Sequence, residues 1–141
     1  MIMGFCPLNN AAIAARAAQR RGLTRILLLD WDVHHGNGTE QIFWNDPHVL
    51  YISLHRHDFG AFYPGTGSPS KVGGAASQGL NINIAWSHWP GEARVGNGDY
   101  VAALRHVILP VAEEWRPQLV LVSAGFDAVE GDPVGQCHVT P

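Results

Sequence analysis

Cysteine is scarce in this chain of 141 residues, which contains only Cys6 and Cys137, far apart in the sequence. There is no CxxC pair, so a zinc site made of cysteines is excluded and a disulfide framework is disfavoured. Two reduced thiols in an intracellular protein are the simpler interpretation.

Long apolar runs and an excess of positive charge are also missing. Runs such as Ile26–Leu29 are far too short to span a bilayer, and the first residues do not form a signal peptide. Lys and Arg number 9 against 12 Asp and Glu, a net charge of -3, which gives no basic surface for a nucleic acid. We therefore predict neither a membrane nor a direct nucleic-acid partner.

The hydrophobic fraction of 46% is sufficient for a packed core, and the chain is long enough for one domain. Apolar runs that read as strands alternate with helical patterns, which predicts an α/β fold with a mainly parallel sheet. Pro110 lies inside the last helical pattern and should kink or split it. The predicted strands are 25–32, 49–54, 80–86 and 119–122; the predicted helices are 11–18, capped by Asn9 or Asn10, a short one capped by Thr39, and 99–115; residues 58–79 are a predicted loop.

Polar side chains collect where three of these strands end. The first strand runs into Asp30 to Gly36, the second into Ser53 to His55, and the last into Ser123 to Asp127. Ligand sites in open parallel sheets form beyond the carboxyl ends of the strands. We therefore expect the functional site at this edge.

The spacing of Asp30, Asp32 and His34 indicates a metal site. In an extended chain these side chains share one face, and two adjacent carboxylates repel unless a cation lies between them. Zinc accepts carboxylate oxygen and imidazole nitrogen, and Asp127 is the natural third ligand. The alternative is that both aspartates cap a loop and that His34 packs as a satisfied core histidine.

The wider motif pattern resembles the histone deacetylase family. Trp31 and Asn37 resemble its class II branch, and the motifs occur in the family's order across nearly the whole chain. They are Gly4-Phe5-Cys6 with Asn9, Asp30-Trp31-Asp32-Val33-His34-His35-Gly36-Asn37-Gly38-Thr39, Ser53-Leu54-His55-Arg56, Phe62-Tyr63-Pro64-Gly65-Thr66-Gly67, Ser123-Ala124-Gly125-Phe126-Asp127 and Gly131-Asp132-Pro133.

This resemblance implies a three-layer arginase/deacetylase-like α/β fold, present only in part, with one zinc ion and bound monovalent cations (K+ or Na+). Several ligands of the cations would be backbone carbonyls, and the second cation site matches only loosely. The implied ligands are Asp32, His34 and Asp127 for zinc; Asp30, Asp32, His34, Ser53 and Leu54 for the first monovalent cation; and Phe43, Asp46, Val49 and Leu80 for the second.

The resemblance also assigns residues around the zinc. Phe5 and Tyr63 match the two walls of the acyl-lysine tunnel, and most family members have Phe in place of this tyrosine. Asp30 and Asn37 match residues that hydrogen-bond the family's paired catalytic histidines. His35 is not a ligand in this interpretation.

The implied reaction is hydrolysis of acetyl-lysine in histones or other proteins, in the nucleus or the cytoplasm, with a corepressor complex as a possible partner. Residues 1–141 would form a partial catalytic domain, because the family's paired-histidine segment precedes Gly4 and its Gly-Gly-Tyr segment follows the last motif. The isolated chain should then be inactive. Two alternatives remain, an amidohydrolase of acetylpolyamines or other small amides and a non-catalytic fragment that acts through interaction.

Overall fold

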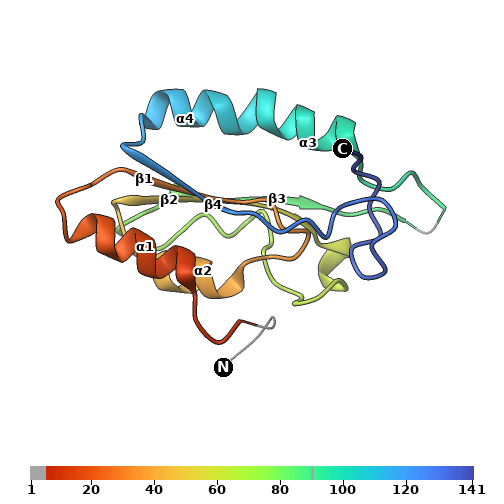
Figure 1. Cartoon of the computed structure of the whole chain (residues 1–141), viewed down its shortest axis with the longest axis horizontal. Coiled ribbons are helices and arrows are strands. Elements are labelled where there is room, and N and C mark those ends of the chain that lie inside the picture. The colour runs from red at the N-terminus through yellow and green to blue at the C-terminus, as the bar shows by residue number, and fades with distance from the viewer. Residues whose placement is uncertain (1–5, 90) are drawn as a thin grey trace.

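The chain folds into three layers, with a parallel sheet between two layers of helices (Figure 1). The computed structural model describes residues 6–89 and 91–141. The four strands lie in the order β3-β2-β1-β4 and every neighbouring pair is parallel, as the sequence predicted. The strands are β1 (Ile26–Asp30), β2 (Val49–Arg56), β3 (Asn81–Trp86) and β4 (Leu119–Ser123).

Helices α1 (Asn10–Gln19) and α2 (Asn37–Phe43) cover one face of the sheet. The predicted cap of α1 is confirmed, since the Asn9 side chain accepts a hydrogen bond from the Ala12 N–H at 2.8 Å. The prediction that Thr39 caps the second helix is wrong, because α2 starts at Asn37 with Gly36 at its N-cap, so Thr39 lies inside the helix. Thr39 is buried, and its hydroxyl accepts a hydrogen bond from the Asn9 amide, which ties the two helices together.

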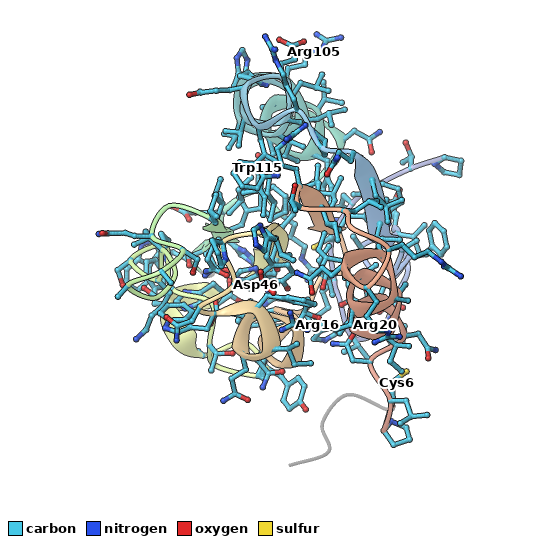
Figure 2. The ribbon with its side chains drawn as sticks, turned by 90° about the vertical axis from the view of Figure 1, so that its left-hand side faces the viewer. Cys6, Arg16, Arg20, Asp46, Arg105 and Trp115 are labelled. Carbon is cyan, nitrogen blue, oxygen red and sulfur yellow. The ribbon has the colours of Figure 1, made fainter. Side chains whose placement is uncertain are left out.

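The other face is covered by one long helical segment made of α3 (Asn97–Ala103), the π-helical turn η2 (Leu104–Ile108) and α4 (Leu109–Trp115). The π turn ends two residues before Pro110, so the predicted disturbance takes the form of a widened turn. Proline lacks an N–H and its ring crowds the carbonyl four residues earlier, which a wider turn relieves. In Figure 2, Arg105 points outward from this layer, whereas Trp115 packs toward the sheet.

Strand β1 ends at Asp30, earlier than predicted, because short polar bonds shape the following residues. The Asp32 N–H donates to the Asp30 carboxylate at 3.3 Å, and the His34 N–H donates to the Asp32 carboxylate at 2.7 Å. Loop 31–36 therefore turns instead of extending. Both cysteines are free, and no helix among the described residues has the length and apolar character to cross a membrane.

Candidate metal centre

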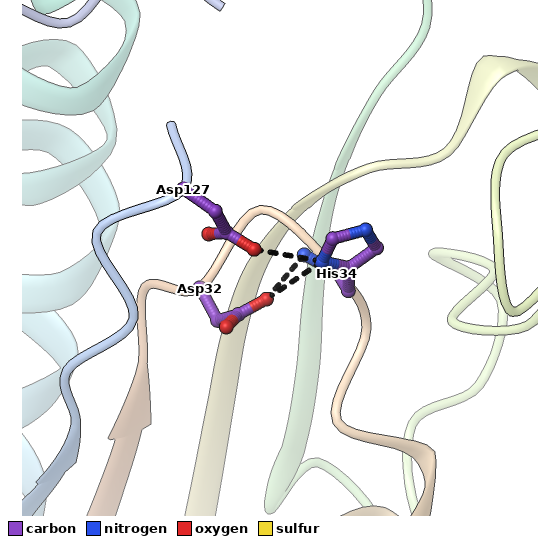
Figure 3. A group of neighbouring side chains, drawn as sticks. All are labelled: Asp32, His34 and Asp127. Atoms are coloured by element: carbon purple, nitrogen blue, oxygen red, sulfur yellow. Dashed lines mark hydrogen bonds and ion pairs between the residues drawn. The ribbon is translucent and has the colours of Figure 1, made fainter. Parts of the chain in front are cut away.

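Three side chains from the ends of two neighbouring strands converge on one point (Figure 3). Asp32, His34 and Asp127 each offer one ligand atom, and these atoms lie within 4.8 Å of one another. His34 Nδ1 is 3.1 Å from an Asp32 oxygen and 2.8 Å from an Asp127 oxygen. The three side chains are 22 to 35% exposed, so an ion can reach them from solvent. Two carboxylates and one imidazole match the donor set of zinc.

The backbone holds these side chains in place. The Val33 N–H donates to the second oxygen of Asp127 at 2.9 Å, which fixes this carboxylate against loop 31–36. Gly125 allows the close approach of the two segments, because a Cβ atom there would lie 2.2 Å from an Asp32 carboxylate oxygen. The glycine after β4 is therefore required by the geometry of the site.

Without a bound metal ion, the electrostatics of the site favour a protonated His34, whose positive charge takes the place of the cation. The hydrogen bond to Asp127, followed by that to Asp32, raises the pKa of His34 to about 9. Burial alone would raise the pKa of Asp127, but the hydrogen bonds from His34 and from the Val33 N–H outweigh it and lower this pKa. A metal ion would have to displace the His34 proton, as metal ligands generally require.

Asp30 is more deeply buried than these three residues and does not belong to their group. It is 5% exposed, it accepts a hydrogen bond from the Tyr51 hydroxyl at 3.2 Å, and it pairs in register with Ser53. Burial, and next the charge of Asp32, raise the pKa of Asp30 to about 7. The side chain of Leu54 belongs to the apolar core on the α3–α4 side, so this residue could act on a cation only through its backbone.

Of the residues predicted for the second cation, Phe43, Asp46 and Val49 lie from the end of α2 to the start of β2, and Leu80 directly precedes β3. The Asp46 N–H donates to the Phe43 carbonyl, the Val49 N–H donates to the Asp46 carbonyl, and the Leu80 carbonyl accepts from Tyr51 on β2. The Asp46 carboxylate is engaged by Arg16 and Gln19 of α1 (Figure 2). A cation here would therefore bind through carbonyl oxygens.

Aromatic rings border His34. The Phe62 ring stacks on the imidazole with centroids 5.2 Å apart, and the half-exposed Tyr63 ring meets it edge-on at 6.0 Å. The sequence drew attention to Tyr63, yet Phe62 makes the closer contact. Asn37 is half-buried at the start of α2, and Phe5 lies outside the described residues.

A buried polar network behind the metal centre was missed from the sequence. His35 places Nδ1 2.8 Å from the Thr66 hydroxyl and Nε2 3.3 Å from the Glu40 carboxylate. Glu40 also accepts hydrogen bonds from Asn81 and Asn83, each at 2.9 Å. Two asparagines at alternate positions of one strand were the available signal, since they share a face of β3.

The fold and the site together define an α/β protein with a metal-competent Asp-His-Asp group at the carboxyl edge of a parallel sheet. The model of the histone deacetylase domain matches residues 1–141. The chain is 53% identical to histone deacetylase 15 of Arabidopsis thaliana over 139 residues and 52% identical to histone deacetylase 7 of Homo sapiens over 141 residues. The chain belongs to the histone deacetylase family and is close to the class II members, as Trp31 and Asn37 predicted.

Solved structures agree with this assignment. A crystal structure of the HDA15 HD domain superposes with a TM-score of 0.94 at 53% identity, and the structure of the histone deacetylase Clr3 with a TM-score of 0.89 at 47% identity. These comparisons cover 99% and 95% of this chain but only 38% and 23% of the other chains. The chain likewise spans 24% of histone deacetylase 15 and 15% of histone deacetylase 7.

Proposed function

We propose that this chain supplies the metal-binding core of a zinc-dependent protein lysine deacetylase. The observation that carries the proposal is the convergence of Asp32, His34 and Asp127 within 4.8 Å, in a chain of this family. Bound there, zinc supplies Lewis acidity toward the acyl carbonyl and lowers the pKa of the attacking water. Asp32, His34 and Asp127 would hold the ion through two carboxylates and one imidazole, the type of three-ligand set found at catalytic zinc sites.

Residues of this chain also shape the approach to the site. The Phe62 ring covers one face of the His34 imidazole, and the Tyr63 ring borders it edge-on. The resemblance assigns proton transfer and oxyanion stabilisation to a histidine pair and a tyrosine outside these 141 residues, so turnover is proposed for the longer protein. Asp30 and Asn37 are assigned to orient that histidine pair, and Asp30 with Ser53 to hold K+ or Na+.

The proposed substrates are acetylated proteins, histones among them, and a corepressor complex is a possible partner. Hydrolysis of acetylpolyamines or other small amides is the second candidate reaction, because the metal motif is common to both. A purely interacting, non-catalytic fragment is the third possibility for the chain alone.

The test is acetate release by the longer protein from an acetyl-lysine peptide and from an acetylated polyamine. We expect turnover of the peptide, and we expect Asp127→Asn to reduce it to background while a surface variant such as Arg105→Ala retains it. The 141-residue chain alone should bind zinc without measurable turnover. Preferential turnover of the polyamine would favour the second reaction, and full activity of the Asp127→Asn variant would contradict the metal site.

A further inference from the structure

Arg56, the last residue of β2, lies beside the metal centre, although the proposed chemistry gives it no task. Its side chain is only 13% exposed. Its backbone N–H donates to the Val33 carbonyl at 2.9 Å, which places the residue directly against loop 31–36. A nearly buried guanidinium requires several partners, and those partners indicate what it does.

The first partner is the aromatic ring that packs on a proposed metal ligand. The guanidinium carbon of Arg56 lies over the Phe62 ring, 4.4 Å from its centroid. The same ring stacks on the His34 imidazole at an interplanar angle of 16°. Phe62 therefore connects the guanidinium to His34 through direct contacts.

The second partner belongs to the segment that follows Asp127. Nη1 of Arg56 donates to the Gly135 carbonyl at 3.1 Å and to the Gln136 side chain at 3.4 Å. Gly135 lies against the backbone of Asp127, because a Cβ atom there would be 1.9 Å from the Asp127 carbonyl oxygen. Arg56 therefore also reaches the second ligand loop, through one intervening residue.

The third partner orients the guanidinium itself. Nε donates to the Asp58 carboxylate at 2.6 Å, and the other oxygen of Asp58 lies 3.4 Å from His88 Nδ1. A planar guanidinium can stack on a ring and donate from its edge at the same time, whereas an ammonium group cannot. The arrangement is therefore specific for arginine.

We propose that Arg56 is a positioning residue that couples the two metal-ligand loops, holding His34 through Phe62 and Asp127 through Gly135. This inference rests on the proposed function, in which these ligands bind zinc. Loss of the guanidinium should loosen both ligands together and weaken metal binding, while the backbone bond from Arg56 to Val33 remains.

The first experiment titrates the chain with Co2+, a visible probe for zinc sites, and follows the d–d absorption bands. We expect Arg56→Lys and Arg56→Ala to bind about 10- to 100-fold more weakly, the effect typical of residues that orient metal ligands. Arg94→Ala is the matched control, since Arg94 is exposed and donates to the Gln136 carbonyl on the same segment without touching Phe62. Wild-type affinity in both Arg56 variants would overturn the proposal.

A double-mutant cycle then tests the route through Phe62. Arg56→Lys and Phe62→Leu should each weaken Co2+ binding, and the double variant should lose less than the product of the two effects, because both act on the same stack. Independent, multiplicative losses would show that Arg56 does not act through this ring.

Proton NMR of the metal-free chain separates this inference from the proposed function. The ring current of Phe62 shifts the resonances of the His34 ring protons. These resonances are assigned by their absence from the spectrum of the His34→Gln variant. We expect Arg56→Lys to move these resonances and Arg94→Ala to leave them unchanged. A wild-type chain that binds no Co2+ would refute the proposed metal site, whereas unmoved His34 resonances in Arg56→Lys would refute the role of Arg56.

Discussion

At the scale of single residues, the centre is built from side chains that need a cation between them. Two carboxylates meet at His34, and in the metal-free chain the imidazole proton supplies the missing positive charge. Deeper in the site, burial and Asp32 raise the pKa of Asp30 to about 7, so this carboxylate too is sensitive to a neighbouring cation. The protonation of these residues and the binding of a metal are therefore linked.

The first prediction concerns the pH dependence of metal binding. The hydrogen bonds to Asp127 and Asp32 raise the pKa of His34 to about 9, so at pH 7 a bound metal must displace this proton. The apparent affinity for zinc should rise by about tenfold per pH unit up to pH 9. Calorimetry in buffers of different ionisation enthalpy at pH 7 should show about one proton released from His34.

The same shift has a consequence for stability without metal. A raised folded-state pKa gives stability that is complete below the ordinary histidine pKa of 6.5 and is lost as the pH rises through about 9. In EDTA, the melting temperature should therefore fall between pH 7.5 and 9.5, and the fall should be smaller in His34→Gln. Equal falls in both chains, or no proton release at pH 7, would contradict the assignment.

The second prediction separates two adjacent histidines. His34→Ala should abolish zinc binding, because a three-ligand site cannot lose one ligand and keep its geometry. His35→Ala should retain zinc but lower the free energy of unfolding by about 2 kcal/mol, because Glu40 loses a partner. Burial alone would raise the pKa of Glu40, but hydrogen bonds from His35, Asn83 and Asn81 lower it to about 2.

Zinc content by mass spectrometry and urea unfolding of the metal-free chains measure these two effects. Asn83→Ala is the control for the network. It removes one hydrogen bond to Glu40, and Asn83 is far in sequence from the proposed metal ligands. Equal loss of bound zinc in the His34 and His35 variants would show that the two side chains are not functionally distinct.

At the scale of elements, the parallel strands carry the site, and the sequence predicts them better than it predicts the turns. The continuous apolar run Ile26–Leu29 and the alternation 81–84 identify buried strands, and the rule for open sheets places the site at their carboxyl ends. The strand predicted for residues 25–32 ends at Asp30, and the extended chain expected to carry Asp32 and His34 is wrong, because side-chain bonds to the backbone replace the strand ladder. Such local bonds have no periodic signature.

The Phe62 stack and the Arg56 contacts could not be predicted for a similar reason. They join β2, loop 57–67 and the segment after Asp127, which are far apart in sequence. Contacts of this kind follow from the packing of whole elements and not from local spacing. Recognition of motifs identified the proposed ligands, but only the folded chain shows which residues position them.

The third prediction compares two glycines in different elements. Gly38 lies in α2, where an added Cβ would meet nothing within 4 Å, so Gly38→Ala should raise the free energy of unfolding by about 0.5 kcal/mol. Gly125→Ala should instead displace Asp32, because the new methyl group would lie 2.2 Å from its carboxylate oxygen.

Urea unfolding and Co2+ titration of both variants distinguish the two effects. Gly38→Ala should bind Co2+ as the wild type does, whereas Gly125→Ala should bind it at least about tenfold more weakly. Normal Co2+ affinity in Gly125→Ala would mean that the segments after β1 and β4 need not approach so closely.

At the scale of the whole molecule, the sheet is unevenly covered. Strand β3 and strand β4 form its two edges among the described residues. On β4 the exposure alternates, and Val120 and Val122 are 49% and 39% exposed. They pair in register with Leu27 and Leu29, which pack on the side of α3 and η2. An apolar cavity of about 180 Å³ lies in the same layer, lined by Leu29, Trp31, Leu54, Tyr100, Val101, Leu104 and Ile108.

The last prediction is that the 141-residue chain self-associates through the β4 edge of the sheet. Exposed apolar edge strands offer unpaired N–H and C=O groups together with apolar side chains, and they template pairing with other chains. The solved HDA15 domain is longer, and this chain covers 38% of it, so the exposure concerns the 141 residues taken alone.

Sedimentation velocity from about 5 to 100 µM should show mass increasing with concentration. A lysine at an edge position opposes such pairing, so Val120→Lys should shift the chain toward the monomer. Ile13→Lys, at an exposed position on α1, is the matched control and should leave association unchanged. A chain that stays monomeric throughout, or that associates equally with Val120→Lys, would show that β4 is not the contact.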